Sequence, residues 1–156
     1  MKIGLASDHG GFELKETLKK FLTEKKYEII DYGSTVYDPK DDYPDFSEKI
    51  SKAIIKSEIE RGILICGSGV GACIAANKFK GVRAAICHDT YSAHQGVEHD
   101  DMNILCLGAR IVGYELAKDL VVAFLGAKFL NLERLERRLN KVIGFENNFA
   151  KRSGKS

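Results

Sequence analysis

One cysteine of the chain stands at the junction of an apolar run and a glycine-rich segment. Residues 63–66 are apolar up to Cys66, and Gly67-Ser68-Gly69-Val70-Gly71 leads from there into an alanine-rich helical stretch. A glycine-rich turn before a helix lets the backbone approach an anion, and the helix N-terminus offers unpaired N–H groups with a partial positive charge. The same helix end favours a thiolate, so Cys66 could act as a base beside an anion site. A tight turn without a ligand and a buried, inert cysteine are the alternatives.

The loop after the first apolar run offers a second set of polar groups. Ser7-Asp8-His9-Gly10-Gly11 follows the apolar residues 3–6 directly. Ligands of open α/β sheets bind outside the carboxyl ends of the strands, so we expect Asp8 and His9 to lie on the same rim as Cys66. Capping of the following helix is the alternative for Asp8.

Histidines and carboxylates crowd the region between the fourth and fifth predicted strands. The group consists of His88, His94, His99, Asp100 and Asp101. His94 and His99 are five residues apart, without an HExxH motif or paired cysteines, so we expect no metal site. General acid or base catalysis is the better use of one histidine, and we expect His99 to share the rim with Asp8 and Cys66.

Arginines in the second half of the chain suit a phosphate group. Arg110 follows the fifth predicted strand, and Arg134 and Arg138 stand one helical turn apart on the last helix, opposite its leucines. The planar guanidinium matches phosphate oxygens with two parallel hydrogen bonds, and this spacing lets the two side chains converge. Arg137 is instead spaced to pair with Glu133 on a solvated face.

The last predicted helix has a second distinctive face. Its apolar residues, Leu132, Leu135, Leu139, Val142 and Ile143, recur at a spacing that resembles the a and d positions of a coiled coil. A helix of this kind packs on something beyond its own sheet. We therefore expect it to serve dimerisation.

The glycine-rich segment also fits the dinucleotide-binding pattern, which keeps another class of function open. Ala72 would take its last place, and Asp89 lies about 20 residues further on, where that pattern has an acidic residue. The chain would then be a non-catalytic nucleotide or sugar-phosphate binding module. Against this, the loop follows the third predicted strand, and 156 residues leave no room for a separate substrate domain.

Short apolar runs alternate with helical patterns along the chain. Strands are predicted at residues 3–6, 28–32, 63–66, 82–87 and 104–107, with helices between them and a last helix over about 132–143. Strands that are apolar throughout and alternate with helices predict a parallel sheet covered on both faces. The predicted fold class is therefore α/β, an open, doubly wound, parallel five-stranded sheet of Rossmann-like type in three αβα layers. We expect one domain over residues 1–150 and a polar tail over residues 151–156.

Composition excludes several classes of function. The 24 basic and 22 acidic residues give a net charge of +2, which is too balanced for a nucleic-acid or membrane surface, so a small molecule is the expected partner. No apolar run approaches the ~20 residues that cross a bilayer, and the four cysteines form no CxxC pair. We expect a cytoplasmic protein with reduced thiols, in which Cys73, Cys87 and Cys106 are small buried hydrophobes.

Taken together, these segments resemble the ribose-5-phosphate isomerase B family, which also includes the subunits of galactose-6-phosphate isomerase. The likeness rests on Ser7-Asp8-His9-Gly10-Gly11-Phe12 with Leu14-Lys15, on Asp42-Tyr43-Pro44, and on Ile65-Cys66-Gly67-Ser68-Gly69-Val70-Gly71 with Ala75-Ala76-Asn77-Lys78. It extends from residue 1 to about residue 142. The resemblance implies an isomerase that interconverts ribose 5-phosphate and ribulose 5-phosphate without metal or cofactor, at sites shared between the two subunits of a homodimer. Whether dimers pair into tetramers is left open.

The resemblance also implies a role for each matching residue. Cys66 would move a proton between C1 and C2 through a cis-enediolate, Ser68 would assist proton transfer at the sugar oxygens, and His99 would assist ring opening. The remaining residues would bind substrate: Gly67, Gly69, Val70 and Gly71 as an anion hole, Asp8, Tyr43 and Asp100 at the sugar, and His9, Arg110, Arg134 and Arg138 at the phosphate.

The sequence departs from the family pattern at two places. Asp100 stands where family members commonly have an asparagine that touches the sugar, and a carboxylate cannot donate a hydrogen bond. Asn131-Leu132-Glu133-Arg134-Leu135 replaces the usual Gly-Gly-Arg-His, so that Arg134 and Arg138 align only with one inserted residue and an ungapped alignment selects Arg137. An isomerase for a tetrose phosphate, or for a hexose phosphate such as galactose 6-phosphate, is therefore an alternative.

Overall fold

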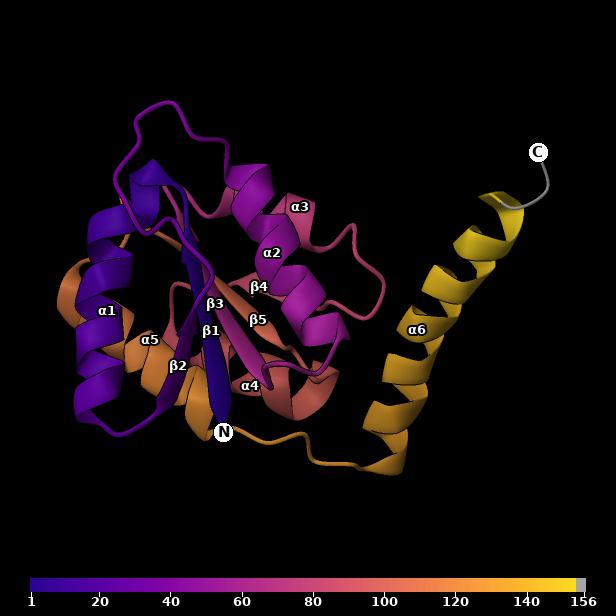
Figure 1. Ribbon diagram of the computed structural model, residues 1–156. Helices are drawn as coiled ribbons and strands as arrows, with labels where there is room; N and C mark the ends of the chain where they lie inside the picture. The colour runs from indigo at the N-terminus through magenta and orange to yellow at the C-terminus, as the bar shows by residue number, and fades with distance from the viewer. Residues whose placement is uncertain (154–156) are drawn as a thin grey trace.

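The computed structural model describes residues 1–153 as strands that alternate with helices (Figure 1). The strands are β1 (Lys2–Ser7), β2 (Glu28–Asp31), β3 (Arg61–Cys66), β4 (Ala84–Ile86) and β5 (Ile104–Gly108). The helices are the short η1 (His9–Gly11), then α1 (Phe12–Glu24), α2 (Tyr43–Ile55), α3 (Val70–Ala76), α4 (Thr90–Asp100), α5 (Tyr114–Gly126) and α6 (Glu133–Ser153). No helix in this part of the chain is long and apolar enough to cross a membrane.

The five strands form one sheet in which every pairing is parallel, in the order β2-β1-β3-β5-β4. The predicted fold class is therefore confirmed. The order reverses between β1 and β3, whose register pairs Ser7 with Ile65. Crevices at such reversal points, outside the carboxyl ends of the strands, are where open α/β sheets bind ligands.

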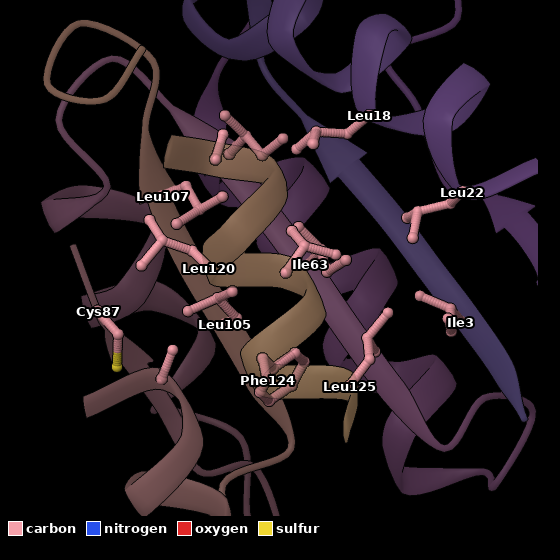
Figure 2. Close-up of a cluster of buried hydrophobic side chains, with 14 of the residues drawn as sticks. Ile3, Leu18, Leu22, Ile63, Cys87, Leu105, Leu107, Leu120, Phe124 and Leu125 are labelled. Atoms are coloured by element: carbon pink, nitrogen blue, oxygen red, sulfur yellow. The ribbon is translucent and has the colours of Figure 1, made fainter. Parts of the chain in front are cut away.

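Helices cover the sheet on both faces because its strands are apolar on both faces. On one face Leu18 and Leu22 of α1 and Leu120 and Phe124 of α5 pack against Ile3 and other strand residues (Figure 2). On the other face α2 and α3 bury Ile50, Ala53, Ala72 and Ala76 against Leu64, Ile104 and Cys106. These two apolar layers fix the strand ends, and so the loops that carry the polar groups of interest.

A buried ion pair fastens α1 to the end of β2. Lys15 is fully buried, and its Nζ lies 2.8 and 3.0 Å from the two carboxylate oxygens of Asp31. Lys19 adds a second contact of 2.7 Å to the same carboxylate. Burial alone would raise the pKa of Asp31, but hydrogen bonds from Lys15 and Lys19 outweigh it and lower the pKa below its ordinary value.

The last helix extends away from the layered body, on the right of the view in Figure 1. Leu135 near its start is buried, whereas Val142 and Phe145 further along are 48% and 63% exposed. The helix continues to Ser153, into the segment expected to be a polar tail, and residues 154–156 lie outside the described part of the chain. An apolar face on a helix with so little cover in a single chain is typical of a surface that another protein chain covers.

Candidate active site

A cavity of about 380 Å³ opens between the carboxyl ends of β1 and β3, where the strand order reverses. It is lined by Asp8, His9, Gly10, Tyr43, Cys66, Gly67, Ser68, Gly71, Arg110 and Ile111. Most of the residues singled out from the sequence near the first, third and fifth strands therefore meet in one place. Ile111, which is 61% exposed, carries no chemical signal in the sequence and joins the cavity only through the fold.

Backbone contacts hold the loop after β5 against the loop after β3. The N–H of Ala109 donates to the carbonyl of Cys66 at 2.8 Å, and the N–H of Arg110 donates to the carbonyl of Gly67 at 2.9 Å. These bonds continue the parallel pairing of β3 with β5 beyond the last strand residues. They place the exposed Arg110 side chain at the mouth of the cavity.

Cys66 lines this cavity from the last position of β3, just before the loop that leads into α3. Cys66 is 5% exposed, and its Sγ accepts a hydrogen bond from the backbone N–H of Gly69 at 3.1 Å. Gly69 has φ +82°, and a Cβ there would lie 3.1 Å from the carbonyl carbon of Leu107, so the turn requires glycine. The sulfur therefore lies against a backbone donor of the loop that leads into α3.

Ser68, in the loop after β3, and Tyr43, the first residue of α2, line the same cavity as Cys66. The exposed Ser68 accepts the N–H of Val70 through its Oγ at 3.3 Å, which places the hydroxyl at the first turn of α3. The Tyr43 ring lies directly against Gly71, because a Cβ at position 71 would come within 2.7 Å of Tyr43 Cζ. The glycine thus lets an aromatic residue of α2 reach the rim of the cavity.

Asp8 combines the two roles weighed for it from the sequence. Its Oδ1 accepts the N–H of Gly11 at 3.2 Å, which caps the short helix η1, and its side chain also lines the cavity. Burial raises the pKa of Asp8 above its ordinary value, against the opposing effect of the Gly11 hydrogen bond. The carboxyl is therefore a capping group that still faces the ligand space.

His9 stands between the main cavity and a neighbouring polar one. The second cavity, of about 460 Å³, is lined by His9, Gly10, Glu13, Leu14, Thr17, Tyr37, Ala109, Arg110, Val112 and Tyr114. The His9 Nδ1 lies 2.6 Å from Oδ1 of Asp41, and this contact raises the pKa of His9 above its ordinary value. Asp41 is a site residue that sequence reasoning missed, because it is 32 residues away in a loop with several similar aspartates.

Asp8, His9 and Asp41 also have potential metal ligand atoms within 4.8 Å of one another. Two ligand atoms at ~2.1 Å from a tetrahedral metal stand about 3.4 Å apart. The His9 Nδ1 and the Asp41 Oδ1 are 2.6 Å apart, a distance that suits a shared proton and not a shared metal ion. The geometry of this cluster is that of a hydrogen-bonded pair.

A second group of predicted site residues lies elsewhere. His99 and Asp100 end α4, which runs antiparallel to the strands, so they lie towards the amino edge of the sheet. Asp100 lines a separate cavity of about 450 Å³ with Leu139 and Val142 of α6, and Arg134 and Arg138 are exposed on the first turns of that helix. The expectation that His99 shares a rim with Cys66 is therefore wrong within one chain.

The other residues of the central segment have local structural partners. The Nε2 of His88 accepts the N–H of Gly108 at 3.1 Å, which secures the end of β5. His94 lies 3.5 Å from Glu98 one turn along α4. Asp89, the acidic residue of the dinucleotide-like pattern, caps α4 by accepting the N–H of Ser92 at 2.7 Å. Arg137 pairs with Glu133 at 2.9 Å, as its spacing predicts.

The remaining cysteines are free thiols with different surroundings. Cys87 and Cys106 are buried as predicted, and burial raises the pKa of Cys87 to about 11. Cys73 is only half-buried, which corrects the expectation of a buried residue: its Sγ donates to the carbonyl of Ala84 at 3.5 Å, on β4 at the edge of the sheet. Hydrogen bonding with Cys106 lowers the pKa of Cys73 to about 7.

The chain is similar in sequence to a known protein family and to individual proteins. The sequence model of the Ribose/Galactose Isomerase family matches residues 3–142. Ribose-5-phosphate isomerase B of Escherichia coli (strain K12) is 46% identical over 145 residues, which cover 93% of this chain and 96% of that protein. D-erythrulose-4-phosphate isomerase of Pectobacterium atrosepticum is 41% identical over 132 residues, which cover 83% of this chain and 85% of that protein.

The fold is also similar to solved structures of ribose-5-phosphate isomerase B. The structure of Clostridium thermocellum ribose-5-phosphate isomerase B superposes with a TM-score of 0.92 at 46% identity, covering 96% of this chain and 99% of that chain. Ribose-5-phosphate isomerase B from Mycoplasma genitalium, solved with bound ribulose 5-phosphate, superposes with a TM-score of 0.87 at 41% identity, covering 94% and 96% of the two chains.

Proposed function

The chain belongs to the ribose/galactose isomerase family of sugar-phosphate isomerases, and we propose that its own reaction is the interconversion of ribose 5-phosphate and ribulose 5-phosphate. The observation that carries this proposal is the Cys66 sulfur, held 3.1 Å from the Gly69 N–H in a cavity that also contains Asp8 and Tyr43. A base beside backbone donors is what proton abstraction next to a carbonyl requires. The relative of known structure with bound ribulose 5-phosphate supports the choice of sugar.

The proposed chemistry moves one proton between neighbouring carbons. The Cys66 thiolate takes the proton from C2 of the open-chain aldose, electrons shift to the C1 carbonyl oxygen, and a cis-enediolate forms. Ser68 exchanges a proton between the two oxygens, and Cys66 returns its proton to C1, which gives the ketose. Backbone N–H groups of residues 67–71 would stabilise the charge that develops on oxygen, typically by ~3 kcal/mol for each donor. Atoms and electrons balance within the sugar, so no oxidant or reductant enters.

The substrate phosphate would lie beside His9 and Arg110, which line both cavities. A charged imidazole and a guanidinium are suitable donors for phosphate oxygens. Asp8 and Tyr43, which line the same cavity as Cys66, would contact the sugar hydroxyls.

We propose that a second copy of the chain completes each site. His99, Asp100, Arg134 and Arg138 lie outside the Cys66 cavity of their own chain, so they can take the roles implied by the resemblance only at a partner's cavity. Exposed apolar residues support such a contact: Val142 and Phe145 on α6, and Val70 and Ile74, 49% and 58% exposed, on α3 beside the Cys66 loop. A two-fold homodimer would bury these surfaces against each other and form two shared sites.

A tetrose phosphate is the alternative substrate. Asp100 cannot donate the hydrogen bond that an asparagine at this position would offer, and the relative from Pectobacterium atrosepticum is named for erythrulose 4-phosphate. A hexose phosphate such as galactose 6-phosphate is the remaining candidate in this family. The four free thiols suit a reducing compartment, and we propose the cytoplasm.

The test is an isomerase assay with four-, five- and six-carbon aldose phosphates, each with and without a chelator. We expect the highest kcat/KM for ribose 5-phosphate and no effect of the chelator. A higher kcat/KM for a tetrose or hexose phosphate would replace the proposed substrate. Tight binding of NAD without turnover of any sugar phosphate would instead support the binding-module hypothesis.

A further inference from the structure

The loop between β2 and α2 places the carboxylate of Asp41 against His9. Its Oδ1 accepts the backbone N–H of His9 at 3.0 Å and lies 2.6 Å from Nδ1 of the same residue. One oxygen thus holds both the main chain and the ring of His9. With Nδ1 engaged by Asp41, Nε2 is the ring nitrogen left to meet a ligand.

The side chains of Asp41 and His9 are both largely shielded from water, which strengthens the attraction between their charges. The Asp41 side chain is 10% exposed and that of His9 is 31% exposed. The second oxygen of Asp41, Oδ2, is buried and has no hydrogen-bond partner within residues 1–153. A carboxylate taken out of water needs a positive partner, and the one ion pair that Asp41 makes in this part of the chain is with His9. The pair is therefore most stable with the imidazole charged.

We propose that Asp41 is a positioning residue that holds His9 as an imidazolium with Nε2 directed to the substrate phosphate. The inference rests on the proposed function, in which His9 binds that phosphate. It extends that function by naming a residue outside the cavity lining that determines the affinity for the phosphate and its dependence on pH.

The groups around the imidazole raise or lower the pKa of His9. The hydrogen bond to Asp41 raises the pKa of His9, burial and the positive charge of Arg110 lower it, and the charge of Asp8 raises it. Tyr37 packs edge-on against the ring, with centroids 6.3 Å apart, and Glu13 lines the second cavity with His9. The net effect is a pKa above the ordinary value, so His9 keeps its charge to a higher pH than a free histidine.

The test replaces only the charge of Asp41. Asp41→Asn keeps an oxygen that can accept both His9 donors but removes the negative charge. Asp38→Asn is the matched control: Asp38 is exposed on the same loop, and its Oδ1 accepts the N–H of Lys40, which asparagine can also do. The His9 ring is titrated by NMR in each protein, with its signals assigned from a His9→Asn variant, and KM and kcat for ribose 5-phosphate are measured from pH 6 to pH 9.

We expect Asp41→Asn to lower the pKa of His9 by roughly one unit and to leave kcat unchanged. The ratio of variant to wild-type KM would then rise from near 1 below both pKa values towards about tenfold above them. Asp38→Asn would match the wild type. An unchanged His9 titration, or a rise in KM that is equal at every pH, would overturn the proposal, because a merely structural role gives the second pattern.

Binding of inorganic phosphate makes the test independent of turnover. Phosphate binding, followed through the His9 signals, is expected to weaken in Asp41→Asn at high pH and not at low pH. If the wild type isomerised no sugar phosphate, the proposed reaction would fail while this result still supported the role of Asp41. If the affinity for phosphate were the same in both proteins at every pH, the role of Asp41 would be refuted whatever the reaction.

Discussion

Replacement of Gly69 with alanine should damage the reaction much more than the fold. Gly69 has φ +82°, which costs a side-chain-bearing residue about 1–2 kcal/mol. An alanine Cβ would also lie 3.1 Å from the carbonyl carbon of Leu107 and 3.2 Å from the backbone nitrogen of Gly108. Both neighbours are backbone atoms of β5 and cannot swing away as a flexible side chain would. The turn that carries the Gly69 N–H therefore has to move.

That movement disturbs the 3.1 Å contact between the Gly69 N–H and the Cys66 sulfur. A hydrogen bond to a charged group contributes ~1.5–3 kcal/mol, which corresponds to a loss of roughly 10- to 150-fold in kcat. The melting temperature of the variant should fall by roughly 2–8 °C because of the unfavourable backbone conformation alone. Isomerase kinetics and thermal unfolding of the same preparation measure both effects.

Gly81 provides the matched control. It has φ +90°, but no atom lies within 4 Å of the position its Cβ would take, and it is in the loop before β4, away from the cavity. Gly81→Ala should therefore lose a similar amount of stability and keep the wild-type kcat. Equal kcat values for Gly69→Ala and Gly81→Ala would refute the reasoning that the Gly69 N–H supports a reactive sulfur.

Three further predictions concern stability, specificity and assembly. Lys15→Met should cost ~1.5–3 kcal/mol in urea unfolding at neutral pH, because it removes the buried partner of Asp31 while Lys19 keeps its contact with the same carboxylate. Because folding lowers the pKa of Asp31, this stabilisation is present above the ordinary pKa of ~3.9 and is lost as pH falls through the pKa of the folded state. An equal cost of Lys15→Met at pH 2 would contradict this prediction. Asp100→Asn should raise kcat/KM for ribose 5-phosphate about fivefold, which corresponds to one hydrogen bond of ~1 kcal/mol. An unchanged ratio of pentose to tetrose activity would show that Asp100 does not select the sugar. Phe145→Asp should yield inactive monomers in analytical ultracentrifugation, whereas an active monomer would rule out shared sites.

The strand pattern and the rim at β1 and β3 could be predicted because both follow from local sequence. Residues 3–6 and 63–66 are apolar throughout, and such runs form central parallel strands whose carboxyl ends share an edge. Cys66 ends one of these runs and Asp8 lies two residues after the other, so their meeting follows from the parallel pairing of the two strands. The pair of Arg137 with Glu133 was equally predictable, because four residues make one turn of a helix.

His99 could not be placed in the same way. The sequence shows only that His99 lies between the fourth and fifth strands, whereas the helix that carries it runs antiparallel to the strands and ends towards their amino ends. Asp41 was missed for a related reason: its partner His9 is 32 residues away, and the neighbouring Asp38 and Asp42 have the same composition signal. Contacts between loops depend on the packing of α1 and α2, which periodicity does not report.

The most direct measurement of the central claim is the turnover of ribose 5-phosphate by a Cys66→Ala variant, with loss of the C2 proton followed by NMR. The side chain is 5% exposed and alanine fits the space it leaves, so folding, checked by circular dichroism and melting, should persist. With Cys66 as the base, removal of the sulfur should slow proton loss and ketose formation together by roughly 10²–10⁴-fold. A folded variant that forms ribulose 5-phosphate at the wild-type rate would contradict the account.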